Sequence, residues 1–199
     1  MGEFYCIFKN ILSDVERKRK RLNQHLPEFL AYLEYAAAYF DFNNIANPLV
    51  VEIGILDGAQ EQFYKRLLFA EYISIDIDKN APATIHGDSG DTKIFEKLMA
   101  LLSGRKIDLL FIDGLHTYAG VKRDYELYSP LVSHLIGIHD VLTYKLNEKD
   151  SVDVKRWWQE MLDSNKEDTL FTIQHYNPRP PEAFNGRPLG IGIIVKGRI

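Results

Sequence analysis

The feature that most restricts the fold is an alternation of short apolar runs with helical patterns, which begins near residue 48. Two of the runs, LVVEI at 49–53 and IDLLFI at 107–112, are almost wholly apolar, as strands buried on both faces usually are. Further strands are predicted at 72–77, 135–138, 169–174 and 189–195. Strands that alternate with helices imply right-handed crossovers, so we expect an α/β fold with a mostly parallel sheet covered on both faces.

The segments between these strands have helical spacing. A helix is predicted over 60–69, a second after the capping residue Asp91, a third ending before Pro130, and a fourth around the Trp157–Trp158 pair. Residues 13–42 are also predicted to be helical, with Ser13 or Asp14 as the cap and a break at Pro27. We therefore expect an N-terminal helical cap over residues 1–46 and a second domain over 47–199.

Charge and cysteine content exclude several classes of protein. The formal net charge of −4 makes nucleic acid an unlikely partner, and the single Cys6 excludes an internal disulfide and favours a reducing compartment. No apolar run approaches the roughly 20 residues that span a bilayer, and the first residues do not resemble a signal peptide. We expect a soluble, cytoplasmic protein. The basic run RKRKR at 17–21 is interpreted as a solvated helix face, with contact to RNA, an acidic partner or membrane as the alternative.

A glycine-containing turn follows the first strand, in the stretch from Glu52 to Gly58. Gly54 and Gly58 allow a tight turn and a close approach of the backbone to a ligand, and the next helix presents free N–H groups. The pattern is not GxGxxG, because Leu56 and Ala59 interrupt it, which argues against NAD or FAD. The alternative is an ordinary strand–turn–helix connection.

Polar residues also follow the second strand. Asp76 lies where an acid that binds ribose hydroxyls is expected in a nucleoside-binding sheet, and Asp88 or Ser89 could accept a bond from an adenine amino group. The alternatives are an exposed turn acid at Asp76 and an Asx turn at Asp88 that caps the next helix.

Two central strands each end on an aspartate. The strand at 107–112 leads to Asp113 and His116, and the strand at 135–138 leads to His139 and Asp140. Carboxylates at one sheet edge are suitable ligands for Mg²⁺ or a similar divalent cation, and histidine can accept a proton near neutral pH. His139 is either a hydrogen-bonding residue beside the site or a ligand that would suit Fe, Mn or Zn.

Five stretches occur in a recognisable order: VEIGILDG, SIDID, HGDS, DLLFIDGLHTYAGVKRDYELYSPLV and LIGIHDV. Together they resemble class I S-adenosylmethionine-dependent methyltransferases, in particular the metal-dependent small-molecule O-methyltransferases. These include the catechol type and the group from cephalosporin biosynthesis and macrolide-sugar methylation. The resemblance covers about residues 48–196 and implies a Rossmann-like seven-stranded sheet whose last strand is antiparallel.

The resemblance also implies roles for individual residues. The residues that would bind S-adenosylmethionine are Glu52, Gly54, Gly58, Asp76, Asp88, Ser89 and Asp113. Asp113, Asp140 and His139 would hold Mg²⁺ or another divalent cation, and His116 would be the general base, with Asp113 as the second catalytic residue. The implied reaction is methyl transfer to a hydroxyl group of a small molecule, by an enzyme that could form a homo-oligomer. Two alternatives stay open: a metal-independent RNA or protein methyltransferase, and an NAD-type oxidoreductase or non-catalytic nucleoside binder.

Overall fold

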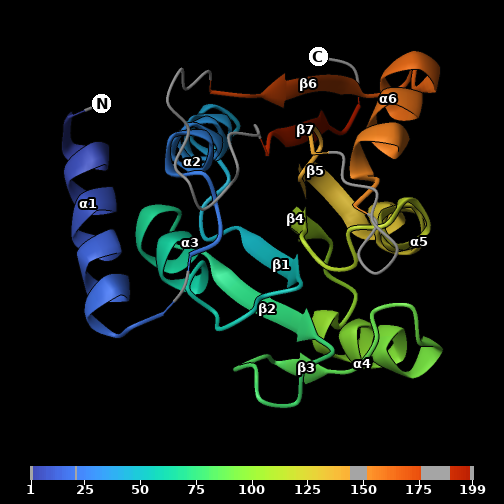
Figure 1. The fold of residues 1–199 in the computed structure, drawn as a ribbon, viewed down its shortest axis with the longest axis horizontal. Helices are drawn as coiled ribbons and strands as arrows, with labels where there is room; N and C mark the ends of the chain where they lie inside the picture. The colour runs from blue at the N-terminus through green and yellow to red at the C-terminus, as the bar shows by residue number, and fades with distance from the viewer. Residues whose placement is uncertain (1, 21, 144–151, 176–188, 198–199) are drawn as a thin grey trace.

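The computed structural model describes residues 2–20, 22–143, 152–175 and 189–197 (Figure 1). A seven-stranded sheet with the strand order β3-β2-β1-β4-β5-β7-β6 forms its centre. The strands are β1 (Leu49–Ile53), β2 (Glu71–Asp76), β3 (Ile85–His86), β4 (Ile107–Ile112), β5 (Val132–His139), β6 (Thr169–Ile173) and β7 (Ile191–Val195). β1 to β5 are parallel to one another, and β7 is antiparallel to both β5 and β6. The expected α/β fold with an antiparallel last strand is confirmed.

Helices cover both faces of the sheet (Figure 1). One face carries α1 (Gly2–Arg17), α2 (Leu26–Phe42) and α3 (Glu61–Leu67), and the other carries α4 (Thr92–Leu102), α5 (Tyr118–Tyr128) and α6 (Val154–Ser164). A short 3₁₀ turn, η1 (Ser129–Leu131), joins α5 to β5. The molecule is therefore a three-layer sandwich.

Successive side chains along each strand point to opposite faces of the sheet, so one strand contributes to the core on both faces. In β4, Leu109 and Phe111 join the cluster under α1–α3, whereas Leu110 and Ile112 join the cluster under α4–α6. All four side chains are buried. Burial of each such side chain stabilises the fold by about 1.5–3 kcal/mol relative to exposure, which explains why this strand has almost no polar residue.

Local signals agree with several helix boundaries. The Asp91 side chain accepts a hydrogen bond from the Lys93 backbone N–H at 2.8 Å, so the predicted cap of α4 is confirmed. α5 ends at Tyr128, before Pro130, as the sequence predicts. Trp157 and Trp158 are both buried on α6.

The N-terminal segment differs from the prediction. α1 begins at Gly2, so Ser13 and Asp14 lie inside a helix and do not cap one. Pro27 lies in the first turn of α2, where its missing N–H costs no helical bond, and the break between the helices precedes it. The basic run is also not a helix face, because α1 ends at Arg17 and residues 18–20 follow it. The remaining basic residue of the run, at position 21, lies outside the described residues.

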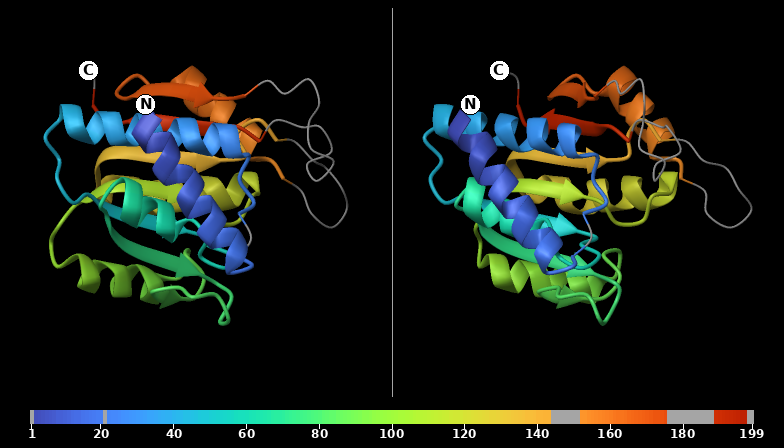
Figure 2. Two further views of the ribbon diagram at one scale, coloured as in Figure 1. Left: turned by 90° about the vertical axis from the view of Figure 1, so that its left-hand side faces the viewer. Right: turned by 60° about the vertical axis from the view of Figure 1, so that its left-hand side comes forward.

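The two N-terminal helices share a core with the rest of the chain. Figure 2 shows α1 and α2 on the same side of the sheet as α3. The ring of Phe63 lies 5.0 Å from that of Phe8 and 5.3 Å from that of Phe29, measured between centroids. The division into a cap and a second domain stays a prediction. Within the described ranges, every helix is too short or too polar to cross a membrane.

Candidate active site at the carboxyl ends of the central strands

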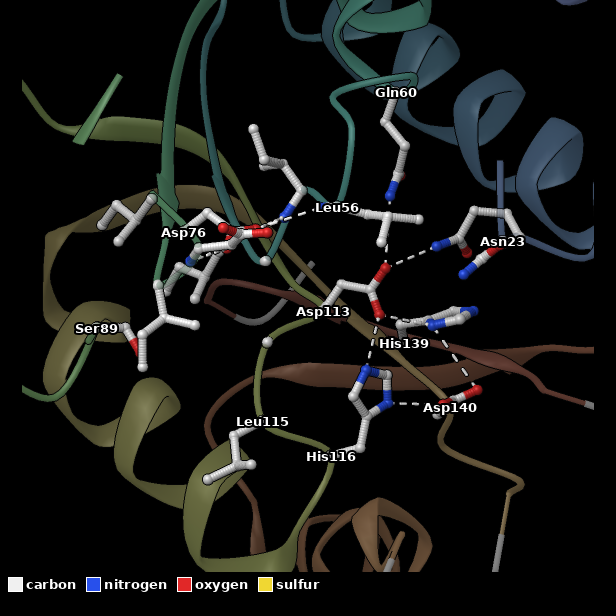
Figure 3. Close-up of a pocket in the computed structure, with 18 of the residues that line it drawn as sticks. Asn23, Leu56, Gln60, Asp76, Ser89, Asp113, Leu115, His116, His139 and Asp140 are labelled. Atoms are coloured by element: carbon white, nitrogen blue, oxygen red, sulfur yellow. Dashed lines mark hydrogen bonds and ion pairs between the residues drawn. The ribbon is translucent and has the colours of Figure 1, made fainter. Parts of the chain in front are cut away.

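A cavity of about 780 Å³ opens beyond the carboxyl ends of β1, β2, β4 and β5 (Figure 3). It lies beside the switch point of the sheet, where β1 has β2 on one side and β4 on the other. This is the place where open parallel sheets bind ligands. Figure 3 shows Asp76 and Ser89 on one side of the cavity, His116, His139 and Asp140 on the other, and Asp113 between them.

Gly54 brings the loops after β1 and β4 into contact. Its φ of +82° is a left-handed conformation, and a Cβ added there would lie 2.3 Å from the carbonyl oxygen of Asp113. The Asp113 N–H in turn donates to the carbonyl of Ile53 at 2.8 Å. Only glycine fits this position, for reasons of both conformation and space. The turn therefore places Asp113 directly against the glycine loop.

Asp76 organises the loop after β1. Its Oδ2 accepts hydrogen bonds from the backbone N–H groups of Ile55 at 2.8 Å and Leu56 at 3.2 Å. Its Oδ1 accepts from the N–H of Asp78 at 2.8 Å. The carboxylate thus belongs to the cavity lining and also holds the backbone that forms the floor of the same region.

The predicted adenine residues Asp88 and Ser89 line the cavity and are anchored by α5. Asp88 Oδ1 accepts from the N–H of Gly90 at 2.9 Å, which is the Asx turn considered from sequence, and from Arg123 at 2.8 Å. The Ser89 hydroxyl donates to Asp124 at 2.8 Å. Burial raises the pKa of Asp124, against the effect of the Ser89 hydrogen bond and the nearby Arg123.

Two residues predicted to bind the nucleoside do not line the cavity. Glu52 is fully buried on the α1–α3 side of the sheet, and its carboxylate accepts a hydrogen bond from the hydroxyl of Tyr72. Burial raises the pKa of Glu52 well above its ordinary value. Gly58 has a φ of +69° and closes a turn through its N–H bond to the carbonyl of Ile55 at 2.8 Å. Neither residue belongs to the cavity lining, although Gly58 lies in the loop between the lining residues Leu56 and Ala59.

Asp113 is the centre of a cluster with two histidines. Its Oδ1 lies 2.7 Å from His139 Nδ1 and 3.5 Å from His116 Nε2. His139 is 5% exposed, and its Nε2 has no hydrogen-bond partner among the described residues. Because these side chains come from the ends of β4 and β5 and from the loop after β4, they meet only in the folded sheet.

The Asp140 carboxylate contacts both histidines. Its Oδ2 is 2.7 Å from His116 Nδ1, and its Oδ1 is 3.7 Å from His139 Nδ1. The residue has a φ of +62°, a conformation that is unfavourable for a side chain other than glycine and is found at functional sites when the surroundings enforce it. This turn directs the Asp140 carboxylate back toward the ring of His116.

The cluster is electrostatically coupled. Burial alone would lower the pKa of His139, but the charges of Asp113 and Asp140 raise it to about 9. The pKa of His116 is also raised, because its hydrogen bond to Asp140 and the charge of Asp113 outweigh burial. The pKa of Asp140 is lowered, since the charge of His139 and the bond to His116 outweigh burial.

Two glutamines complete the site and were not predicted. Gln24 Nε2 donates to Asp113 Oδ2 at 2.7 Å, and Gln60 Nε2 approaches the same oxygen at 3.4 Å. Both residues are buried, and the carbonyl oxygen of each has no partner among the described residues. Gln60 directly precedes α3 and follows the glycine loop, so its position in the sequence could have indicated that it lies at the site. Gln24 follows a chain segment without any motif, so only the fold reveals it.

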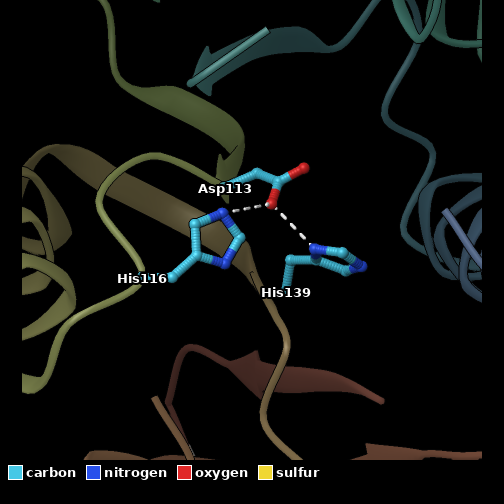
Figure 4. A group of neighbouring side chains, drawn as sticks. All are labelled: Asp113, His116 and His139. Atoms are coloured by element: carbon cyan, nitrogen blue, oxygen red, sulfur yellow. Dashed lines mark hydrogen bonds and ion pairs between the residues drawn. The ribbon is translucent and has the colours of Figure 1, made fainter. Parts of the chain in front are cut away.

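The donor set fits a metal ion. Asp113, His116 and His139 each offer one ligand atom, and these atoms lie within 4.8 Å of one another (Figure 4). The predicted ligands were Asp113, Asp140 and His139, so the group that converges contains His116 in place of Asp140. Carboxylate oxygen and imidazole nitrogen are both common ligands of divalent cations.

The sequence comparison agrees with this fold. The family model described as "Methyltransferase domain" matches residues 51–141, the range from β1 to the residue after Asp140. The matched range is a little under half of the chain, and the match confirms the resemblance to methyltransferases that the motifs predict. A comparison with curated proteins found no match.

Particular solved structures show the same architecture. MycE methyltransferase from mycinamycin biosynthesis, in complex with Mg, SAH and mycinamycin VI, has a TM-score of 0.63 and 16% identity, covering 94% of this chain and 53% of that chain. The O-methyltransferase from Bacillus cereus in complex with SAH has a TM-score of 0.60 and 13% identity, covering 96% of this chain and 91% of that chain. The O-methyltransferase TomG of tomaymycin synthesis from Streptomyces achromogenes, in complex with SAM, has a TM-score of 0.57 and 15% identity. The match covers 83% of this chain and 89% of that chain. The chain spans about half the length of MycE, and at these identities the likeness establishes the fold.

Proposed function

We propose that the protein transfers a methyl group from S-adenosylmethionine to a hydroxyl group of a small molecule, with the help of a divalent cation. The observation that carries the proposal is the shared cavity: a nucleoside-type loop with Asp76 and a cluster of Asp113 with two histidines face the same space. A methyl donor and a hydroxyl acceptor would thus be held next to each other, which is the main requirement of a transfer whose methyl group is already activated.

The donor would lie over Gly54, along the side of the cavity that carries Asp76. The Asp76 carboxylate would accept the ribose hydroxyls, and Asp88 and Ser89 would lie near the adenine. The absence of a GxGxxG pattern supports a nucleoside donor over a dinucleotide with its pyrophosphate. Asp88 is already paired with Arg123, so we expect it to position the loop more than to bind the base directly.

The acceptor would lie beside Asp113, His116 and His139. Methyl transfer to oxygen needs a hydroxyl that has lost its proton, which would pass to solvent or to an imidazole of this cluster that is not bound to the cation. A divalent cation bound by the cluster would lower the pKa of the hydroxyl and stabilise the resulting oxyanion. Gln24 and Gln60 would hold Asp113 in place through its second oxygen.

The size and charge of the cavity support a small acceptor. Pockets for small molecules and cofactors commonly have volumes of about 300–1,000 Å³, and the cavity of about 780 Å³ could take the donor and a compact acceptor. Acidic residues dominate its charged lining, which is unfavourable for RNA. Lys20 of the basic run donates to the carbonyl of Gly58 at 3.2 Å, so part of that run has a structural partner. The neighbours bound to SAH or SAM add support by likeness of fold.

Calorimetric titration of the full chain with S-adenosylhomocysteine and with NAD tests the donor. We expect S-adenosylhomocysteine to bind and NAD not to bind. Asp76→Ala should weaken S-adenosylhomocysteine binding by roughly 10- to 100-fold, because hydrogen bonds to a charged group contribute about 1.5–3 kcal/mol. Methyl transfer is then measured with a panel of catechols, sugars and phenolic acids. Binding of NAD in preference to S-adenosylhomocysteine would reject the proposal.

A further inference from the structure

We propose that the cation site consists of Asp113 Oδ1, His116 Nε2 and His139 Nδ1, and that it selects a transition-metal ion such as Fe²⁺, Co²⁺ or Zn²⁺ over Mg²⁺. The catalytic use of this ion rests on the function proposed above, whereas its binding does not. The inference changes two roles expected from sequence: His116 is a ligand and not the general base, and Asp140 supports a ligand without binding the ion.

The hydrogen bonds identify the nitrogen that each imidazole offers. His116 Nδ1 is 2.7 Å from Asp140 Oδ2, which leaves Nε2 on the side of Asp113, 3.5 Å from its Oδ1. His139 presents Nδ1 to the same oxygen at 2.7 Å. Figure 4 shows both imidazoles turned toward this carboxylate from different elements. An ion bound by these atoms would take the place of the hydrogen bond between His139 and Asp113.

Asp140 is placed to hydrogen-bond a metal-binding histidine without contacting the ion itself. A histidine that binds a metal usually donates its other ring N–H to a carboxylate or carbonyl, which fixes the ring and its tautomer. Asp140 can accept such a bond from His116 Nδ1, and Asp140 itself has a left-handed backbone conformation. Asp140 is also not part of the group whose ligand atoms converge within 4.8 Å.

The type of donor determines the type of metal. Mg²⁺ prefers oxygen ligands in near-ideal octahedral geometry and retains several waters, whereas imidazole nitrogen suits Fe, Ni, Cu and Zn. Here two of the three converging donors are imidazoles, which is the two-histidine, one-carboxylate composition of mononuclear iron centres. His139 is buried at the end of β5, with its ring centroid 6.4 Å from that of Phe111, so the imidazole is part of the packed core beside the site.

Metal binding to the purified full chain, stripped of metal, tests this inference directly. Co²⁺, Zn²⁺, Mn²⁺ and Mg²⁺ are titrated by calorimetry, and Co²⁺ binding is also followed by its visible absorption. We expect Co²⁺ and Zn²⁺ to bind roughly tenfold or more tightly than Mg²⁺, with a Co²⁺ spectrum that indicates nitrogen ligation. The competing explanation, in which protonated imidazoles merely join the two acids, gives no binding of any metal at micromolar concentration.

Variants separate the individual roles. His139→Asp should shift the preference toward Mg²⁺, and the neutral His139→Asn should weaken Co²⁺ binding if the acidic variant does not fold. His116→Gln should also weaken Co²⁺ binding, whereas a pure general base would leave it unchanged. Asp140→Asn should weaken it by about 10- to 100-fold, as loss of an outer-shell partner does. His134→Asn is the matched control, since His134 lies on the same strand as His139 but outside the cavity lining.

The outcomes distinguish this inference from the proposed function. S-adenosylhomocysteine is titrated into the same samples. Binding of S-adenosylhomocysteine together with equal or tighter binding of Mg²⁺ would overturn the metal assignment and leave the methyltransferase proposal intact. Selective Co²⁺ binding without S-adenosylhomocysteine binding would support the site and reject the proposed function. An unchanged metal preference in His139→Asp, with its melting temperature preserved, would also overturn the inference.

Discussion

The two sides of the cavity are built in different ways. On the donor side, Asp76 accepts hydrogen bonds from three backbone N–H groups and Ser89 donates to Asp124, although Arg123 Nε and Asp124 Oδ2 have no partner among the described residues. On the reactive side, three buried atoms have no partner among the described residues, namely the carbonyl oxygens of Gln24 and Gln60 and the Nε2 of His139. Buried polar atoms are rarely left unpaired, and where they are, a ligand, ion or water often satisfies them.

This difference indicates how the cavity is prepared for its ligands. The donor side is a preformed loop, which a nucleoside can enter with little rearrangement. The reactive side carries the cost of a buried carboxylate, a half-buried carboxylate and two imidazoles in close contact, which would be relieved by a cation or an acceptor. Three predictions test whether the two sides differ in this way.

The largest effect is expected where the two sides touch. Gly54→Ala should destabilise the fold by about 2 kcal/mol or more, because the new Cβ would lie 2.3 Å from the Asp113 carbonyl oxygen at a positive φ. Gly104→Ala is the matched control, since Gly104 has nearly the same φ of +84° but no atom within 4 Å of the added Cβ. Gly104→Ala should lower the free energy of unfolding by only about 1–2 kcal/mol. Urea unfolding measures both, and equal losses would show that the close approach is unimportant.

A change confined to the reactive side should affect the chemical step and leave the donor side unchanged. Asp113→Asn should lower the rate of methyl transfer by about 100-fold or more, as loss of a preorganised charged group at a reacting centre does. The affinity for S-adenosylhomocysteine should change much less, because Asp76 and the Gly54 loop are untouched. Asp108→Asn, in the same strand but outside the cavity lining, is the control. Loss of nucleoside affinity equal to the loss of rate would mean that the two sides are one unit.

The smallest effect concerns Glu52, which lies beneath the donor loop. Burial raises its pKa in the folded state, so both states are protonated at low pH, and stability is lost as the pH rises from about 4.5 toward the folded value. Glu52→Gln removes this loss, so its stability relative to the natural protein should increase with pH, by about 1.4 kcal/mol for each pKa unit of the shift. Unfolding at pH 5 and pH 8 measures the change. The exposed Glu71→Gln serves as the control, and a constant difference for Glu52→Gln would contradict the prediction.

Much of the sheet followed from the sequence because its strands are buried on both sides. The strands at 49–53 and 107–112 have the predicted bounds, since continuous apolar runs mark them without ambiguity. β3 was missed because two residues carry no periodicity. The start of α1 was also missed, because the chain lacks a capping pattern there and Asp14 acts in ion pairs with Arg17 and Arg66 instead.

Site residues could be predicted where the topology itself gathers them. Parallel strands end at one edge, so an acid after β4 and an acid after β5 had to lie near each other, and Asp113, His116, His139 and Asp140 do share hydrogen bonds. Glu52 could not be placed by the same rule. It lies within β1, one residue before the strand ends, and the pleat directs its side chain into the core.

The sequence by itself determined the layers, the order of apolar strands and the edge of the sheet at which polar residues gather, because burial and strand periodicity act locally. Only the tertiary structure decided which atoms face one another across that edge. The orientation of His116 toward Asp140, the approach of Gln24 from a helix-free segment and the contact between Gly54 and Asp113 depend on distances between chain segments far apart in sequence, and no local pattern encodes these.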